Sequence, residues 1–329
     1  MLALSRADLR QLVSMPEAVE LMKVAFRELS NGRAQSPLRA VLEVEQGSSA
    51  TLLMPAYVPA QSALGVKVVS VFQGNLAKQL PTIHALVCLV DDETGRPLAI
   101  MEGGYVTALR TGAVSGAATD LLARPDSSVL VVIGAGVQGV TQAAAVTVVR
   151  SIERIIAVDP SADALDRYRA SIARDWPNLS ARLETTTSAA PAVREADVIC
   201  TATTSRKPVF DDEDVKPGTH INAVGAFTPE MQELPTNTVA RAKVVLDSID
   251  AALAEAGDLI IPLNEGRVAR THFATELGHL VDRSTIGRTS PEEITLFKSV
   301  GNAVQDVVVA KKAVDRATER EVGFSFDLG

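Results

Sequence analysis

The chain has 329 residues, 47% of them hydrophobic and 22% charged, and its formal net charge is −8. This length and composition predict a folded protein with a full core and about two domains. The acidic balance, without a cluster of Lys and Arg among aromatic residues, argues against nucleic acid as a partner. No stretch is long and apolar enough to span a membrane, and residues 1–10 lack the apolar core of a signal peptide. We therefore expect a soluble, cytoplasmic protein.

Two cysteines occur, Cys88 and Cys200, each within an apolar run. They predict two buried thiols in a reducing compartment. The four histidines show no metal-ligand spacing with them, so no metal is predicted.

The first third of the chain predicts helices and an antiparallel sheet. Ser14 and Glu17 form a capping box, and apolar residues follow at helical spacing until Gly32. Short β-rich runs with turn residues fill residues 39–101 and favour antiparallel strands. The segment 106–123, rich in Ala, Thr and Gly, predicts a helix that packs closely on a neighbour or a ligand.

From residue 128 onward, strands alternate with helices, which is typical of a doubly wound parallel sheet. The expected strands are 129–133, 154–158, 197–201, 220–224, 244–247 and 294–300. A last helix over 301–320 is expected to return to the first domain. The predicted fold is thus α/β, with a Rossmann domain (116–304) inserted in a smaller α+β domain (1–115 plus 305–329) for substrate binding and dimerisation.

A glycine fingerprint, Gly134-Ala135-Gly136-Val137-Gln138-Gly139, follows the first of these strands and opens a helix. In this context the glycines allow a tight turn, close approach to a pyrophosphate and helix packing, and the phosphates lie at a helix N-terminus. Asp159 comes 20 residues after Gly139, at the end of the next strand, where an acidic residue binds the adenosine ribose. The alternatives are glycines that serve turn geometry alone and an Asp159 that merely belongs to a turn.

Several segments together resemble the ornithine cyclodeaminase and mu-crystallin family. They are the glycine loop, Leu53-Met54-Pro55-Ala56-Tyr57, Gly65-Val66-Lys67-Val68-Val69, the run from Glu102 to Ala113 with its Thr-Ala-Leu-Arg-Thr core, and Ile221-Asn222-Ala223-Val224-Gly225. The resemblance covers nearly the whole chain. It implies a homodimer built through the N-terminal sheet, a nicotinamide placed between the two domains, and chemistry at the α-carbon of an amino or imino acid.

The resemblance assigns three cations, Arg39, Lys67 and Arg110, to the carboxylate of the substrate. Arginine suits this role because its planar guanidinium binds a carboxylate through two hydrogen bonds. Lys67 stands in an apolar strand, so a buried ammonium there needs an anion nearby. The simpler alternatives are a Lys67 on a solvent face, an Arg110 paired with a surface carboxylate and an Arg39 exposed in a loop.

Further positions near the cofactor are expected from the resemblance and from strand ends on the carboxyl edge of the sheet. They are Thr111, Thr201, Ala202, Thr203, Val224, Ser299 and Gly301. For Thr201 to Thr203, a strand end that simply carries small residues is an equal alternative. His84 falls near the family's substrate pocket, although an isolated histidine is more often structural.

The chain departs from the pattern of cyclodeaminases at Leu52 and Phe227, where such members carry a Glu and an Asp. Cyclodeamination must move protons between an amine, an imine and ammonia, which a carboxylate can do and these side chains cannot. The resemblance also includes reductases of cyclic ketimines, which need no such carboxylate. Among the activities that the resemblance implies, we therefore expect reduction of Δ1-pyrroline-2-carboxylate, or its six-membered homologue Δ1-piperideine-2-carboxylate, to L-proline or L-pipecolate, with Lys67 as the proton donor.

The alternatives are an amino-acid dehydrogenase of the alanine or opine type, an ornithine cyclodeaminase, and a non-catalytic crystallin-like protein that binds a nucleotide or another small ligand. For the cofactor, Asp159 is followed by Pro160 and Ser161 instead of an arginine, which favours NAD(H). Arg167 and Arg169 on the next helix leave NADP(H) open.

Overall fold

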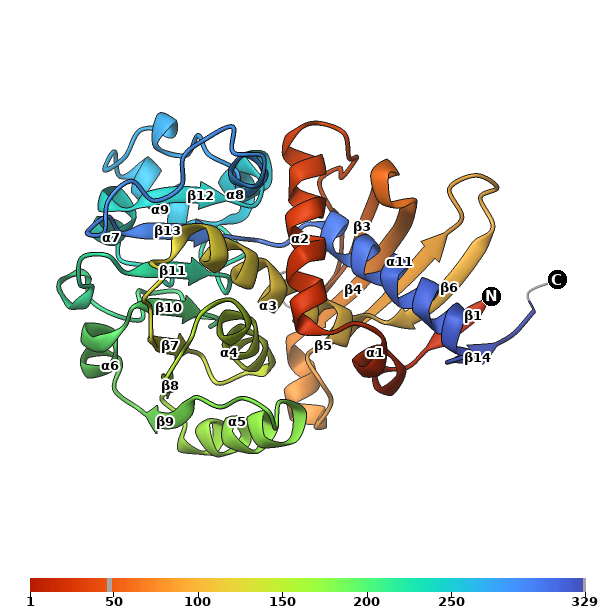
Figure 1. Cartoon of the computed structure of the whole chain (residues 1–329), viewed down its shortest axis with the longest axis horizontal. Coiled ribbons are helices and arrows are strands. Elements are labelled where there is room, and N and C mark those ends of the chain that lie inside the picture. The colour runs from red at the N-terminus through yellow and green to blue at the C-terminus, as the bar shows by residue number, and fades with distance from the viewer. Residues whose placement is uncertain (46–48, 328–329) are drawn as a thin grey trace. The chain divides into compact units, whose positions relative to one another are not determined.

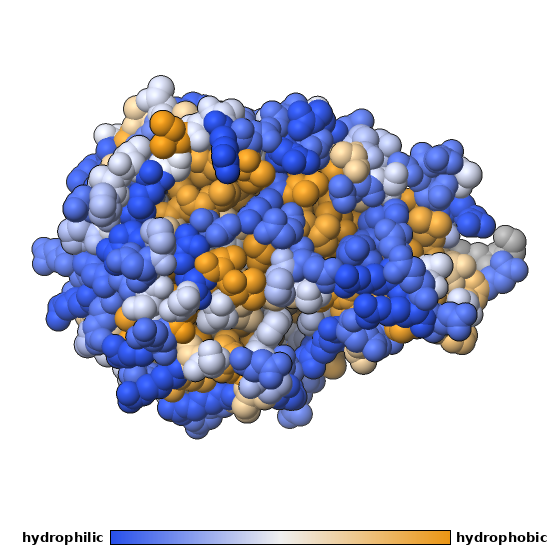
Figure 2. All heavy atoms as spheres, viewed as in Figure 1, coloured by the Kyte–Doolittle hydropathy of each residue, from blue (hydrophilic) through white to orange (hydrophobic). Residues whose placement is uncertain are grey.

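The computed structural model describes residues 1–45 and 49–327. It divides into two compact units: unit 1 comprises Met1–Arg110 and Asn302–Gly329, and unit 2 comprises Thr111–Gly301 (Figure 1). None of the helices in these described ranges has the length and apolar character that crossing a lipid bilayer requires. On the face drawn in Figure 2, hydrophilic residues cover much of the surface, with separate hydrophobic patches among them.

Unit 2 is built on a parallel sheet of seven strands in the order β12-β13-β11-β10-β7-β8-β9. The strands are β7 (Val129–Ile133), β8 (Arg154–Val158), β9 (Arg182–Thr186), β10 (Val198–Thr201), β11 (His220–Ala223), β12 (Lys243–Leu246) and β13 (Thr295–Lys298). The helices are α4 (Val137–Val149), α5 (Ala162–Asp175), α6 (Ala189–Glu195), α7 (Thr236–Arg241), α8 (Ile249–Glu255), α9 (Gly257–Asn264) and α10 (Leu277–Val281), with α3 (Gly103–Leu122) entering from unit 1. Short 3-10 turns lie at Asp212–Asp214 and Arg270–His272.

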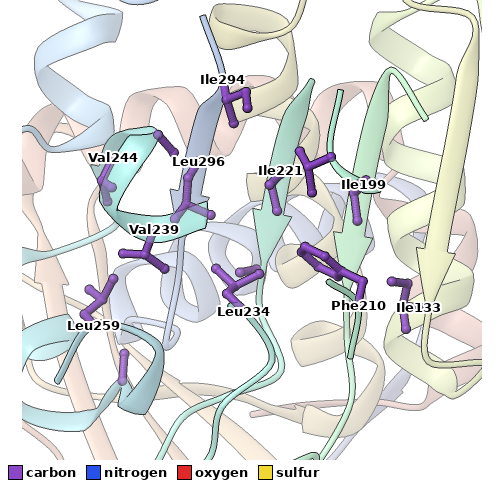
Figure 3. Packing of buried hydrophobic residues seen from close by; sticks show 14 of the residues in the cluster. Ile133, Ile199, Phe210, Ile221, Leu234, Val239, Val244, Leu259, Ile294 and Leu296 are labelled. Carbon is purple, nitrogen blue, oxygen red and sulfur yellow. The ribbon is translucent and has the colours of Figure 1, made fainter. Parts of the chain in front are cut away.

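The strands of unit 2 carry apolar residues on both faces, which explains why helices pack against each face of the sheet. In β7, Leu130 and Val132 belong to a core cluster that includes residues of α4 and α5. The alternate residues Val131 and Ile133 belong to a second cluster, on the opposite face. Figure 3 shows this second cluster, in which side chains of adjacent strands converge with those of the covering segments. The predicted doubly wound fold is confirmed.

Unit 1 holds a mixed sheet of seven strands in the order β14-β1-β6-β5-β4-β3-β2. The strands are β1 (Leu2–Leu4), β2 (Ala40–Glu45), β3 (Ser49–Val58), β4 (Ala63–Phe72), β5 (Ile83–Val90), β6 (Pro97–Glu102) and β14 (Phe324–Ser325). The helices are α1 (Arg6–Leu12), α2 (Met15–Ser30) and α11 (Ala303–Arg320), with 3-10 turns at Pro59–Gln61 and Gln73–Lys78.

The C-terminal helix α11 completes the core of unit 1. It packs beside α2 and against β3 and β4 (Figure 1). Met54 and Val58 of β3 share one buried cluster with Val304 and Val307 of α11. Strands β2 to β6 are antiparallel, as expected, whereas β1 runs parallel to β6. The α+β unit made from both ends of the chain is thus confirmed as part of the fold class.

Three local expectations differ from the structure. Strand β9 was not predicted, because its sequence Arg-Leu-Glu-Thr-Thr is mostly polar and its residues are at most half-buried. Helix α3 begins at Gly103 instead of Val106, so both glycines of the Gly103-Gly104 pair are helical. Cys200 is buried, but Cys88 is only partly so, and the prediction of two buried thiols was wrong for Cys88.

Candidate functional site

A cavity of about 560 Å³ opens at the carboxyl ends of β7, β8 and β10 in unit 2. Ligands bind at this edge in doubly wound folds. Its lining residues are Ile133, Gly134, Gly136, Val158, Asp159, Pro160, Thr187, Ala189, Ala202, Thr203, Thr204, Ser205 and Val209. Five of the residues expected to bind the cofactor therefore line one cavity: Gly134, Gly136, Asp159, Ala202 and Thr203.

The three glycines of the fingerprint have the geometry that a dinucleotide requires. Gly134 has φ +105°, and a Cβ there would lie 2.5 Å from the carbonyl oxygen of Ala202. Gly136 caps α4, and nothing lies within 4 Å of the position its Cβ would take, so space is open at the N-terminus of α4, where backbone N–H groups favour an anion. A Cβ on Gly139 would collide with the carbonyl oxygen of Gly134. The loop thus fits a pyrophosphate at the N-terminus of α4.

Asp159 lies at the end of β8 and lines the cavity. Its Oδ2 accepts a hydrogen bond from the Ala135 N–H (3.0 Å), and its Oδ1 accepts one from the Ser161 N–H (2.9 Å). These bonds fix the carboxylate beside the glycine loop, the position from which it can accept ribose hydroxyls.

The other residues expected near the cofactor do not line this cavity. Val137 and Gln138 form the first turn of α4, where Val137 is 67% exposed, and Gly139 is buried behind them. Thr111 and Thr201 are buried, and Val224 is half-buried after β11. Ser299 and Gly301 both donate to the Asp247 carboxylate, which ties the end of β13 to that of β12.

A buried charge cluster in unit 1 contains two of the three predicted cations. The Lys67 Nζ lies 2.7 Å from Oδ2 of Asp306, and the Arg110 Nε donates to Oδ1 of the same carboxylate (3.2 Å). Arg110 also donates to the side-chain oxygen of Gln305 (2.8 Å). The exposed fractions of Lys67, Arg110 and Asp306 are 2%, 5% and 0%. The alternatives of a solvent-facing Lys67 and a surface-paired Arg110 are therefore excluded.

The register of β4 explains why Lys67 is buried. Ala63, Gly65 and Lys67 alternate on one face of the strand, and Val307 of α11 packs against Gly65 on that face. Asp306 precedes Val307 in the same helix. The anion that Lys67 was expected to need is therefore a side chain of the protein itself.

The electrostatics of the cluster make Lys67 easier to deprotonate than an ordinary lysine. Burial, followed by the charge of Arg110, lowers its pKa from 10.5 to about 8, against the opposing effect of Asp306. Arg39, which is half-exposed, is close enough to lower this pKa further. Both arginines predicted for the substrate carboxylate thus act on the charge of Lys67.

The sequence reasoning missed two acidic residues. Asp306 has a local signal, because Gln305 and Asp306 are the polar pair within the apolar run Ala303–Ala310. Glu233 is fully buried between the ends of β10 and β11, and nothing in its neighbourhood of the sequence marks it. Leu52 and Phe227 stand where cyclodeaminases carry carboxylates. Leu52 is half-buried in β3, and Phe227 is 39% exposed.

The model of the ornithine cyclodeaminase/mu-crystallin family matches residues 1–321. The chain belongs to this family. A Δ1-pyrroline-2-carboxylate reductase of Bacillus cereus is 42% identical to it over 324 residues, 98% of each chain. The structure of the Thermococcus litoralis Δ1-pyrroline-2-carboxylate reductase with NADH and L-proline is similar at a TM-score of 0.94 and 43% identity, covering 99% of this chain and 100% of that one.

A solved structure with a different activity is also similar to this chain. A dimeric archaeal alanine dehydrogenase with bound NAD has a TM-score of 0.92 and 36% identity, covering 100% of this chain and 99% of that one. The family resemblance inferred from the sequence motifs is confirmed.

We expect Asp306→Asn to lower the free energy of unfolding by about 3–5 kcal/mol at pH 6, because two buried cations lose their carboxylate. The pKa of Lys67, already lowered to about 8, should fall further. Between that pKa and 10.5 the unfolded chain binds more protons than the folded one, so stability rises with pH, and in the variant this rise begins earlier. The deficit against the wild type should therefore be smaller at pH 9 than at pH 6 in urea denaturation.

Asp315→Asn is the matched control on the same helix, since Asp315 is 46% exposed and pairs with Lys311. It should cost less than about 1 kcal/mol. A deficit for Asp306→Asn that equals the control, or that does not change with pH, would contradict the expected role of Asp306.

Proposed function

We propose that this chain is a Δ1-pyrroline-2-carboxylate reductase, which reduces the cyclic imine to L-proline with a nicotinamide cofactor. The observation that carries the proposal is the buried cluster in which Lys67 and Arg110 share the single carboxylate of Asp306. The same chain carries a glycine loop suited to a dinucleotide in unit 2, and it is 42% identical to a reductase of this name.

The cluster suits a substrate that carries a carboxylate. The ammonium of Lys67 and the guanidinium of Arg110 together carry one more charge than the carboxylate of Asp306 can neutralise. The cluster is buried, so this net positive charge is costly, and the carboxylate of a bound substrate would neutralise it. Arg110 offers the planar guanidinium for two hydrogen bonds, Lys67 offers a point charge, and Arg39 is the third contact we propose. Their part is to orient the substrate for attack at its C2 atom.

The residues proposed to hold the cofactor are those at the carboxyl edge of the sheet in unit 2. Gly134, Gly136 and the N–H groups that open α4 would bind the pyrophosphate, and Asp159 the ribose. When bound, the reduced nicotinamide supplies the hydride that the protein's own side chains cannot.

Reduction of the C=N bond requires a hydride at C2 and a proton at the ring nitrogen. With a pKa of about 8, Lys67 is largely protonated near neutral pH, and we propose it as the proton donor, directly or through a water. The same pKa lets it recover a proton from solvent after each turnover.

Leu52 and Phe227 favour reduction over cyclodeamination, because neither can exchange protons with ammonia. Glu233, the buried carboxylate nearest in sequence to Phe227 among those described, is already engaged by four donors. An alanine dehydrogenase activity is the second candidate, since a dehydrogenase of that kind is 36% identical.

A substrate panel tests the proposal. We expect NADH oxidation with Δ1-pyrroline-2-carboxylate, with Δ1-piperideine-2-carboxylate as the second substrate, and little with pyruvate plus ammonia. With L-ornithine and NAD, ammonia release should be slower than imine reduction by a factor of about 10² or more. The chain has no carboxylate at positions 52 and 227, and general acid–base catalysis contributes a factor of about that size. Faster turnover of pyruvate plus ammonia would favour the dehydrogenase, and comparable ammonia release the cyclodeaminase.

Arg110→Ala should lower kcat/KM for the imine. The decrease should correspond to a loss of about 2–4 kcal/mol in transition-state stabilisation, the cost of a charge-assisted contact shielded from water. The NADH affinity, measured by fluorescence, should hardly change. Arg316→Ala is the control, since Arg316 of α11 pairs with Glu17 outside the cluster. Full activity of the Arg110 variant would remove this residue from the substrate site.

NADH should be preferred over NADPH, because the Asp159 carboxylate faces the cavity and repels a 2′-phosphate. Arg169 on α5 is engaged by Asp166 and Thr185, which leaves Arg167 as the nearby arginine without a specific bond on the described surface. In the Asp159→Ser variant, the ratio of kcat/KM with NADH to kcat/KM with NADPH should fall by about tenfold. Equal or better efficiency of the wild type with NADPH would refute the preference.

We also propose a homodimer formed through the sheet of unit 1. Large apolar side chains of β2 and β5 are exposed on the single chain, among them Leu42 (57%), Val44 (60%) and Ile83 (51%). Leu42 and Val44 lie two residues apart, on one face of the edge strand β2, and exposed apolar residues that neighbour one another in this way are typical of interfaces between subunits.

A further inference from the structure

Glu233 is the acceptor at the centre of a hydrogen-bond network at the carboxyl edge of the sheet in unit 2. Its Oε2 accepts from the Thr201 hydroxyl (2.9 Å) and from the N–H groups of Gly225 (2.8 Å) and Ala226 (3.1 Å). Its Oε1 accepts from the Thr203 N–H (2.6 Å). One side chain thus holds the loops that follow two adjacent strands, β10 and β11.

All four partners donate hydrogen bonds to Glu233. An ionised carboxylate, which has acceptors only, is therefore the form that matches all four partners. Burial, followed by the neighbouring Asp258, raises the pKa of Glu233, while Lys298 and the bonds from Thr203 oppose that rise. The network therefore keeps a costly buried charge in place by surrounding it with donors.

A second buried pair fixes the backbone of Glu233. Oδ1 of Asp258 accepts from the N–H groups of Glu233 (2.7 Å) and Leu234 (3.0 Å). Its Oδ2 lies 3.0 Å from the Nζ of Lys298, which is fully buried at the end of β13. Three adjacent strand ends, those of β13, β11 and β10, are thus linked through Asp258 and Glu233.

Of the two loops held by Glu233, the one that follows β10 forms part of the proposed nucleotide cavity. Ala202 and Thr203 line it, and the Ala202 carbonyl lies against Gly134, the first glycine of the fingerprint. A Cβ on Gly225 would collide with both Thr203 and the Glu233 carboxylate, so Gly225 leaves the space that the Glu233 side chain uses. A shift of Glu233 would therefore move the wall of the cavity on which the glycine loop rests.

We propose that Glu233 is a positioning residue of the dinucleotide site, acting through Ala202 and Thr203 without touching the cofactor. The inference rests on the proposed role of this cavity in nicotinamide dinucleotide binding. It gives the buried carboxylate a function beyond stability, because the residues that it holds line the cavity.

Glu233→Gln tests the role, because its amide keeps one acceptor oxygen and turns two N–H donors toward groups that themselves donate. We expect the Kd for NADH, measured by fluorescence titration, to rise about tenfold or more, as the loss of a buried acceptor suggests. The KM for NADH should rise with it, while kcat at saturating NADH changes much less. Thermal unfolding without ligand reports whether the variant is folded.

Asp197→Asn is the matched control at the opposite end of β10. Asp197 is buried and accepts from the N–H groups of Ser128 and Val129, but it lies at the amino edge of the sheet, away from the cavity lining. It should lower the unfolding temperature without raising the Kd for NADH. A folded Glu233→Gln variant with the wild-type Kd, or equal losses of affinity in both variants, would overturn the positioning role.

If Glu233→Gln does not fold, Thr201→Val decides, since it removes one of the four donors and keeps the side-chain shape. Weaker NADH binding then supports the role, and unchanged affinity overturns it. A wild-type chain that binds no NADH would instead overturn the proposed function, and this inference with it.

Discussion

The carboxylate of Asp306 is the interaction on which unit 1 depends. It neutralises Lys67 from β4 and Arg110 from α3, and its own helix, α11, reaches them only from the end of the chain, 196 residues beyond Arg110. Two buried cations without it would be very costly. The return of α11 therefore closes the core and creates the electropositive cluster in one step, so the side chains proposed for substrate binding also contribute to stability.

Unit 2 uses buried carboxylates in a different way. Glu233 and Asp247 face mainly backbone N–H and hydroxyl groups from loops at the carboxyl ends of the strands, where parallel sheets leave such donors without strand partners. Each carboxylate joins the ends of two neighbouring strands. The glycine loop needs such support, because a cavity wall made of short loops has little apolar surface of its own to hold it in place.

Local patterns were enough to predict most of the fold. The strand 129–133 and the helix after Gly136 follow from an apolar run and a glycine fingerprint, and both lie where they were expected. Strand β9 was missed because an edge strand pairs on one side only and can be polar, so its sequence carries no apolar period. Cys88 was misjudged for a related reason: an apolar neighbourhood does not tell which face of a strand is covered.

The site was predictable as far as its chemistry is local. Lys67 in an apolar strand implied a buried cation with an anionic partner, yet the chain has 40 Asp and Glu residues, and no spacing rule connects residue 67 to residue 306. Glu233 is harder still, since its partners are backbone N–H groups that every loop possesses. The sequence nevertheless implies that a charged side chain, if it is buried, must have a hydrogen-bond or ion-pair partner. A polar residue within an apolar helical run, as Asp306 is, therefore marks a contact to seek even when its partner is unknown.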